Sequence, residues 1–209
     1  MKKLVTLFYL LILFAGILGC NQDYLPKPKG FNRIDMLPHE YVSLPDTFPY
    51  HFEFSKHARL LSDTSWIAER YWVELYYPYF DATIEMTYKP TYNDEKILRD
   101  YFETAYRLTS KHKQKAYAID EQVIPINNGN LAIVAELSGE VPSQFQFYTT
   151  DSTMNFLRAA LYFKTATQND SLRPVIQYMQ KDMLHILNTL QWKEDFPQEK
   201  LPKPQEPNV

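Results

Sequence analysis

The chain has 209 residues, of which 45% are hydrophobic, and a formal net charge of −3 at pH 7. A mildly acidic chain lacks the clustered Lys and Arg that phosphate backbones require, which argues against a nucleic-acid partner. Five glycines are too few for glycine-rich phosphate-binding loops, and a single cysteine excludes an internal disulfide.

The N-terminus predicts a lipoprotein signal peptide over residues 1–19. Lys2 and Lys3 precede an apolar segment that is too short to span a bilayer stably. This segment ends in Ile-Leu-Gly-Cys at residues 17–20, the pattern that a lipoprotein signal peptidase cuts, so Cys20 becomes the lipidated N-terminus. The alternative is an ordinary secretory signal in which Cys20 is incidental.

Lipidation would place the mature chain in the cell envelope. Loss of Lys2 and Lys3 leaves 20 basic against 25 acidic residues, a net charge of −5. Each buried CH₂ of an acyl chain contributes about 0.8 kcal/mol, so several chains together form a firm membrane anchor. Residues 21–23, Asn-Gln-Asp, lack an acidic cluster after the cysteine, which favours the periplasmic side of the outer membrane.

Composition then divides the mature chain into three parts. Residues 20–40 form an extended tether, because Pro26 and Pro28 favour a semi-rigid backbone of about 3.1 Å per residue. Residues 41–192 form one domain. Residues 193–209 are charged and rich in proline, which predicts a disordered tail.

Within the domain, apolar and polar residues alternate first with the period of strands. Such segments are residues 50–55, 71–77 and 83–88. A helix follows, opened by a capping residue in Asn93-Asp94-Glu95. Its apolar stripe consists of Ile97, Leu98, Tyr101, Ala105 and Leu108.

The second half begins with strands and ends with a long helix. Residues 116–126 and 131–137 flank Asn127-Asn128-Gly129, which favours a hairpin turn, and further strands are expected at 145–149 and 155–164. Ser171 is the expected N-cap of the last helix, with Pro174 in its first turn. Its apolar face consists of Leu172, Val175, Ile176, Met179, Met183, Ile186, Leu187 and Leu190.

This order predicts an α+β fold, an antiparallel sheet with packed helices. The arrangement resembles the Mog1/PsbP-type α/β/α sandwich, a likeness of topology that carries no function.

The polar residues 149–153, Thr-Thr-Asp-Ser-Thr, invite two interpretations. Ser152 could be a hydrolase nucleophile, but no Gly-x-Ser-x-Gly motif surrounds it and the chain is poor in the glycines of oxyanion loops. Asp and Ser side chains also cap neighbouring backbone amides, so the segment can simply close a hairpin. We expect the turn and no catalytic residue.

Metal and cofactor sites are not expected. The histidines lie at positions 39, 51, 57, 112 and 185, and none forms a helical pair with ligand spacing.

Two features are candidates for contact with a partner. Arg158 lies on the strand face opposite Leu157, where it is either a satisfied structural residue or a contact for a partner. The aromatic segment 71–80 contains Trp72, Tyr76 and Tyr79, which form core and rim, or else a protein contact or ligand groove.

Several long stretches resemble the gliding-motility lipoprotein GldD family of Bacteroidetes. They are DYLPKPKGFNRID (23–35), ATIEMTYKP (82–90), QFYTTDSTMNFLRAALYF (146–163) and SLRPVIQYMQKDMLHILNTLQW (171–192). The resemblance implies an accessory envelope lipoprotein tied to gliding and to type IX secretion, with other envelope proteins as partners. It transfers one functional position, the lipidated Cys20, and no catalytic residue.

The leading hypothesis is therefore a non-enzymatic, lipid-anchored accessory or assembly protein for gliding and type IX secretion. One alternative is an envelope module that binds a small apolar or glycan ligand at the aromatic segment. The other is the hydrolase based on Ser152.

Overall fold

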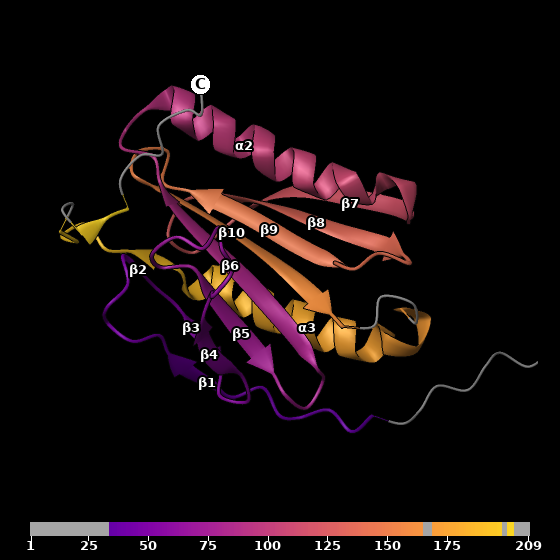
Figure 1. Cartoon of the computed structure of the whole chain (residues 1–209). Helices are drawn as coiled ribbons and strands as arrows, with labels where there is room; N and C mark the ends of the chain where they lie inside the picture. The colour runs from indigo at the N-terminus through magenta and orange to yellow at the C-terminus, as the bar shows by residue number, and fades with distance from the viewer. Residues whose placement is uncertain (1–33, 165–168, 198–199, 203–209) are drawn as a thin grey trace, which may run out of the picture. The chain divides into compact units, whose positions relative to one another are not determined.

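The computed structural model describes residues 34–164, 169–197 and 200–202. Its main feature is a seven-stranded antiparallel sheet with the order β4-β5-β6-β10-β9-β8-β7 (Figure 1). The strands are β4 (Arg59–Ser62), β5 (Val73–Tyr77), β6 (Ala82–Pro90), β7 (Ala116–Pro125), β8 (Leu131–Gly139), β9 (Phe145–Thr150) and β10 (Asn155–Phe163).

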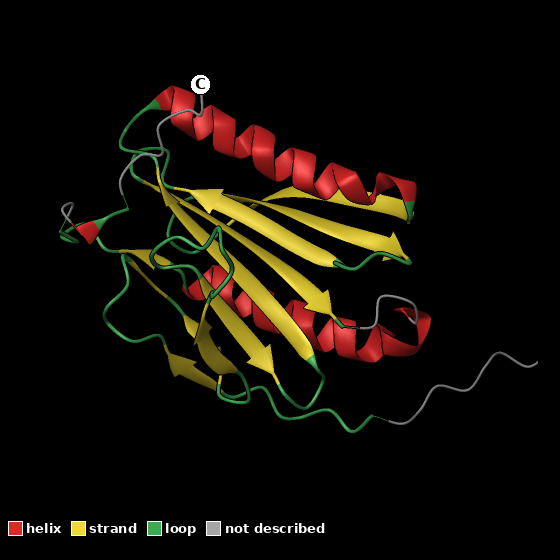
Figure 2. Ribbon diagram, viewed as in Figure 1, coloured by secondary structure: helices red, strands yellow, loops and turns green. Residues whose placement is uncertain are grey.

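The two long helices lie on opposite faces of this sheet, as Figures 1 and 2 show. They are α2 (Glu95–Ser110), which continues into the 3₁₀ helix η1 (Lys111–Gln114), and α3 (Asn169–Thr189). Asp94 caps α2 as expected, since its side chain accepts hydrogen bonds from the backbone N–H groups of Lys96 and Ile97. The predicted α+β class is confirmed, because an antiparallel sheet lies between packed helices.

The larger core lies between the sheet and α3. Leu157, Ala159 and Leu161, at every second position of β10, belong to it. From α3 it receives Val175, Tyr178, Met179, Met183, Ile186, Leu187 and Leu190. The other face of β10 is buried too, because the rings of Tyr101 and Phe102 on α2 pack on Phe156. In α2, however, only Ala105 and Thr109 are fully buried, so the predicted apolar stripe is partly exposed.

The alternating segment 50–55 does not form one strand, contrary to our prediction. It divides into β2 (Tyr50–His51), paired with β11 (Gln191–Trp192), and β3 (Glu53–Ser55), paired with β1 (Tyr41–Ser43). The residues expected on its apolar face, Tyr50, Phe52 and Phe54, are nevertheless all buried. The backbone of this segment therefore pairs first with β11 and then with β1, while its apolar face stays in the core.

Two predicted boundaries were wrong for local reasons. The second strand begins at Val73, because Tyr71 has a φ of 73°, in the left-handed region that a strand does not use. The last helix begins at Asn169, so Ser171 lies inside it and is not its N-cap. Asn169 and Asp170 are residue types that also favour helix starts, so the sequence alone did not distinguish the three positions.

The packed domain is longer than residues 41–192 at both ends. Ile34 and Leu37, which we assigned to the tether, pack against the main core. Part of the expected disordered tail is also ordered: the N–H of Lys193 donates to the carbonyl of Pro49 at 3.0 Å. Further along, the ring of Phe196 meets that of Tyr71. Apolar residues among the prolines and charges of this segment therefore pack on the domain. The average composition of residues 193–209, on which the prediction of disorder rested, does not show such contacts.

Candidate functional site

The polar segment between β9 and β10 is a turn organised by Asp151. One carboxylate oxygen, Oδ1, accepts hydrogen bonds from the backbone N–H groups of Thr153, Met154 and Asn155 at 2.8–2.9 Å. The other, Oδ2, accepts one from the side-chain amide of Asn155. The carboxylate therefore satisfies three backbone N–H groups of the turn and the side-chain amide of Asn155, as the turn interpretation of this segment expected.

Ser152 lies at the exposed tip of this turn. Its φ of 65° is in the left-handed region, and its N–H donates to Thr150 Oγ1 at 2.9 Å. Within the part of the chain that the structure describes, no hydrogen bond joins Ser152 Oγ to a histidine or carboxylate. A nucleophilic serine needs such a base, so this geometry supports a turn residue.

Arg158 is 8% exposed, under α2, and its position fits the structural alternative. Its guanidinium donates to Gln146 Oε1 at 2.5 Å, and the same oxygen accepts the hydroxyl of Thr109 from α2 at 3.2 Å. Arg158 thus joins β10, β9 and α2 through one buried amide, and it offers little surface to a partner.

The three aromatic candidates lie in different environments. Trp72 is half-buried, and its indole N–H donates to the carbonyl of Tyr88 at 2.8 Å. The Tyr76 hydroxyl donates to Asp81 at 2.9 Å. Tyr79 is 56% exposed, so it is the member of the three best placed for a partner.

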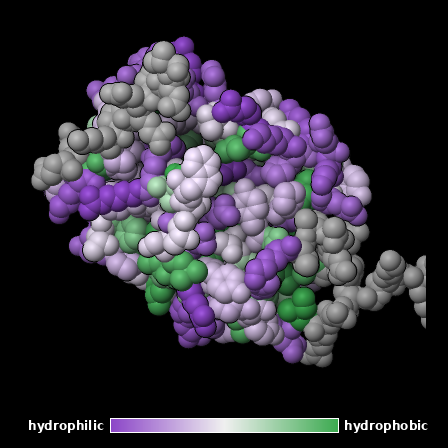
Figure 3. Space-filling view, in the orientation of Figure 1, coloured by the Kyte–Doolittle hydropathy of each residue, from purple (hydrophilic) through white to green (hydrophobic). Residues whose placement is uncertain are grey.

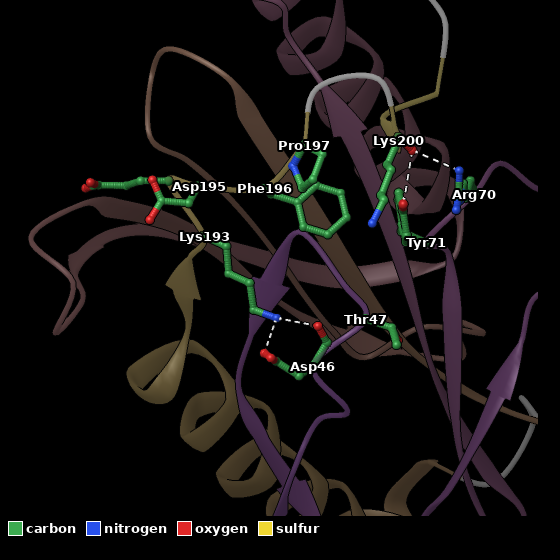
Figure 4. A pocket seen from close by; sticks show the side chains of 10 residues that line it. Asp46, Thr47, Arg70, Tyr71, Lys193, Asp195, Phe196, Pro197 and Lys200 are labelled. Atoms are coloured by element: carbon green, nitrogen blue, oxygen red, sulfur yellow. Dashed lines mark hydrogen bonds and ion pairs between the residues drawn. The ribbon is translucent and has the colours of Figure 1, made fainter.

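A pocket of about 620 Å³ opens beside the start of this aromatic segment (Figure 4). Asp46 and Lys193 point toward one another across it, with Nζ 2.5 Å from Oδ1. On the other side, the side chains of Arg70 and Tyr71 both donate to the carbonyl of Lys200. The lining also includes Thr47, Glu194, Asp195, Phe196 and Pro197. The pocket thus combines two aromatic rings with charges of both signs.

On the face seen in Figure 3, hydrophobic residues form several separate groups among hydrophilic ones. Scattered exposed apolar residues are normal for a protein surface. The hydrophobic residues on this face therefore do not form one continuous apolar patch.

A buried carboxylate that we did not predict joins the N-terminal segment to α3. Asp182 is fully buried and accepts hydrogen bonds from His39 Nδ1 (2.7 Å), Tyr41 (3.1 Å) and Tyr77 (3.0 Å). The rings of Tyr41 and His185 stack at 3.5 Å, and His185 Nε2 lies 2.9 Å from a carboxylate oxygen of Glu53. The sequence already indicated this residue, since Asp182 is a charged residue within the predicted apolar face of the helix.

These contacts change the acidity of the two phenols. Burial, and then the negative charge of Asp182, raise the pKa of Tyr41 and of Tyr77 above the ordinary range of tyrosine. Both therefore stay protonated and keep donating to Asp182 over the whole physiological pH range. The cluster is a hydrogen-bonded junction between residues 39–41, β5 and α3.

Residues 34–164, 169–197 and 200–202 contain no group of three His, Cys, Asp or Glu arranged to hold a metal ion. No helix among them has the length and apolarity needed to cross a membrane. Cys20, the predicted lipidation site, lies outside the described residues.

Comparison with solved structures finds a cyanobacterial PsbP from Synechocystis sp. PCC 6803, determined in solution. The TM-score is 0.45 with 9% sequence identity, over 77% of this chain and 97% of that one. No curated protein matches the chain.

Comparison with family models is decisive. The model described as gliding motility lipoprotein GldD matches residues 21–192, from directly after Cys20 to the end of β11. The match includes all four stretches on which the resemblance rested. The chain therefore belongs to the gliding motility lipoprotein GldD family.

Proposed function

We propose that this protein is a non-enzymatic, lipid-anchored accessory or assembly component of gliding motility and the associated type IX secretion machinery. The observation that carries the proposal is the GldD family match over residues 21–192, which begins directly after the lipidation motif ending in Cys20. The proposed location is the periplasmic side of the outer membrane, with other envelope proteins as partners.

The junction at Asp182 supports an anchored protein that positions a folded domain. The chain that leaves Cys20 reaches His39 and Tyr41, whose side chains are bound to Asp182 on α3. These hydrogen bonds hold residues 39–41 against the folded domain. Such an attachment suits a protein that presents a surface to other envelope components.

Deletion of the gene tests the function. We expect loss of colony spreading and of secretion of type IX cargo, with both restored by the full chain. Restoration by the Ser152→Ala variant is also expected, and failure of this variant alone would revive the hydrolase hypothesis. Unchanged spreading and secretion in the deletion strain would contradict the proposal.

A Cys20→Ala variant tests the anchor. Without acyl chains, the protein cut before residue 20 should leave the membrane fraction, because these chains are its proposed anchor. Separation of the outer and inner membranes on a density gradient then shows which membrane holds the wild-type protein. A Cys20→Ala protein that has lost residues 1–19 and still stays with membranes would contradict lipid anchoring.

The pocket beside Tyr71 keeps one alternative function open, an envelope module that binds a small glycan or apolar ligand. Its volume of about 620 Å³ is in the range of small-molecule sites, and the rings of Tyr71 and Phe196 meet there at 5.5 Å. Titration of the full chain with cell-wall glycan fragments tests it. Binding that the Phe196→Ala variant loses would support this alternative, and absence of binding would remove it.

A further inference from the structure

The strand β7 forms one edge of the main sheet and is unusually long for an edge. It spans ten residues, Ala116–Pro125, and within the described part of the chain it pairs with β8 alone (Figure 1). The opposite edge, β4, has only four residues. A long edge strand presents a row of backbone donors and acceptors to which another chain can add a strand.

Apolar side chains beside this edge are exposed. Tyr117 is 84% and Val123 63% exposed on β7, and Leu131 on β8 is 60% exposed. A groove of about 350 Å³ opens on the α2 side of the sheet next to Val123. Phe102, Ile133 and Tyr148 also line it, so the edge adjoins apolar surface that an incoming side chain could cover.

The middle of the strand is acidic on both faces. Asp120 lies on the α3 side, opposite Glu136 of β8, and Glu121 lies on the α2 side. In the part of the chain that the structure describes, none of these three carboxylates forms an ion pair. Like charges opposite one another destabilise a sheet, so a cation near Asp120 and Glu136 would be stabilising.

The charges also disfavour a second copy of this chain as the occupant. In the antiparallel register that pairs all ten residues of two β7 strands, Asp120 would lie opposite Glu121 of the other copy. A shorter overlap could place Lys115 opposite Glu121, but it would leave half of the strand unpaired.

We propose that β7 is a docking edge for an extended segment of a partner protein, one that carries two adjacent basic residues between apolar ones. The segment adds a strand beside β7 and places its Lys or Arg side chains opposite Asp120 and Glu121. Its apolar residues cover Val123 and the adjoining groove. This assignment rests on the strand itself and is independent of the role in gliding.

Selection from a peptide library tests the edge directly. Ten-residue peptides with apolar residues toward both ends and four adjacent, fully varied positions in the middle are selected for binding to the full chain in detergent. Selected peptides should be enriched in Lys and Arg, and they should slow amide hydrogen exchange in β7. Binders without that enrichment, or an absence of binders that protect β7, would overturn the proposal.

Paired charge reversals test the role of the acidic residues. The exposed Asp120→Lys/Glu121→Lys variant should bind the selected peptides about tenfold more weakly, because two attractive pairs become repulsive. The control, Asp100→Lys/Glu103→Lys, makes the same change in charge on the exposed face of α2 and should bind as the wild type does. Equal loss in both variants would show nonspecific attraction and overturn the proposal. Protection of β7 that rises with protein concentration without peptide would also overturn it, in favour of self-association.

Discussion

At the scale of single residues, Asp151 shows how one side chain determines a local structure. Burial by itself would raise the pKa of this carboxyl. Hydrogen bonds from Asn155, Thr153 and Met154 outweigh burial and lower the pKa below its ordinary value of 3.8. The turn that joins β9 to β10 therefore depends on an ionised carboxylate.

The first prediction concerns the pH dependence of this turn. A group with a lowered pKa in the folded state stabilises the fold above its unfolded pKa, and this contribution disappears as pH falls through the folded value. Asp151→Ala should reduce the free energy of unfolding by about 2 kcal/mol at neutral pH, and by much less in acid below the ordinary pKa. Urea denaturation of both proteins across this pH range measures the difference.

Ser152→Ala is the matched control in the same turn. It removes a hydroxyl that does not titrate, so its effect on unfolding should be small and the same at each pH. An Asp151→Ala effect that stays constant with pH would contradict the assigned role of the carboxylate.

The second prediction concerns the buried carboxylate Asp182. Asp182→Ala leaves the donors of His39, Tyr41 and Tyr77 without their acceptor, which should cost about 3 kcal/mol in the free energy of unfolding. Asp182→Asn keeps one oxygen acceptor and the side-chain shape, so its loss should be smaller. Chemical denaturation ranks the three proteins, and equal stability of wild type and Asp182→Ala would be incompatible with the junction.

Asp182→Ala should also release residues 34–43 from their attachment to α3. Limited proteolysis of Asp182→Ala is expected to cut near residues 34–43 sooner than in the wild type, because this segment loses its polar attachment to α3. Cleavage at an unchanged rate would mean that the apolar contacts of Ile34 and Leu37 hold the segment without Asp182.

At the scale of elements, the pairing of β7 with β8 depends on one glycine. Gly139 has a φ of 117°, and a Cβ there would lie 2.7 Å from the carbonyl oxygen of Lys115 and 2.9 Å from the amide nitrogen of Tyr117. The register of the two strands shifts at this point, between Ala116 and Ala118. The backbones approach so closely that a side chain at residue 139 has no room.

The third prediction follows from this close approach. Gly139→Ala should lower the free energy of unfolding by about 3 kcal/mol, since both the contact with backbone and the positive φ are unfavourable. Gly129→Ala is the matched control, because Gly129 has a φ of 85° but no atom within 4 Å of an added Cβ. Its cost should be about 1 kcal/mol. Thermal unfolding compares them, and equal losses would indicate that φ alone matters.

At the scale of the whole molecule, part of the described chain after β11, in residues 193–197 and 200–202, belongs to the packed structure although the family match ends at Trp192. Phe196 packs on Tyr71, and Leu201 is partly buried against the main core. These contacts border the pocket of Figure 4, whose wall the segment helps to form.

The fourth prediction is that a chain ending after Lys193 still folds, with a free energy of unfolding lower by about 1–2 kcal/mol. Lys193 is kept because it binds Asp46 and Pro49, so the loss reflects mainly the apolar area of Phe196 and Leu201. Phe196→Ala in the full chain should account for about half of this loss. Equal urea midpoints for the truncated and full chains would show that the docked segment contributes nothing.

What the sequence by itself determined depends on local periodicity and on motifs. Alternation and turn residues predicted the strands that became β5 to β10, Asp94 marked the start of α2, and apolar spacing identified α3. These patterns are readable because each reflects contacts between residues near in sequence, or one face turned toward a core. The long shared stretches were likewise sufficient to identify the family.

Only the tertiary structure decided where each side chain finds its partner. Arg158 proved to be bound to Gln146 under α2, and Asp182 joined residues more than a hundred positions away. The exposed edge of β7 and the packing of Phe196 on Tyr71 were also decided only by the tertiary structure. The energies of buried polar groups and of sheet edges depend on neighbours distant in sequence, and these neighbours are set only when the strands assume their order in the sheet.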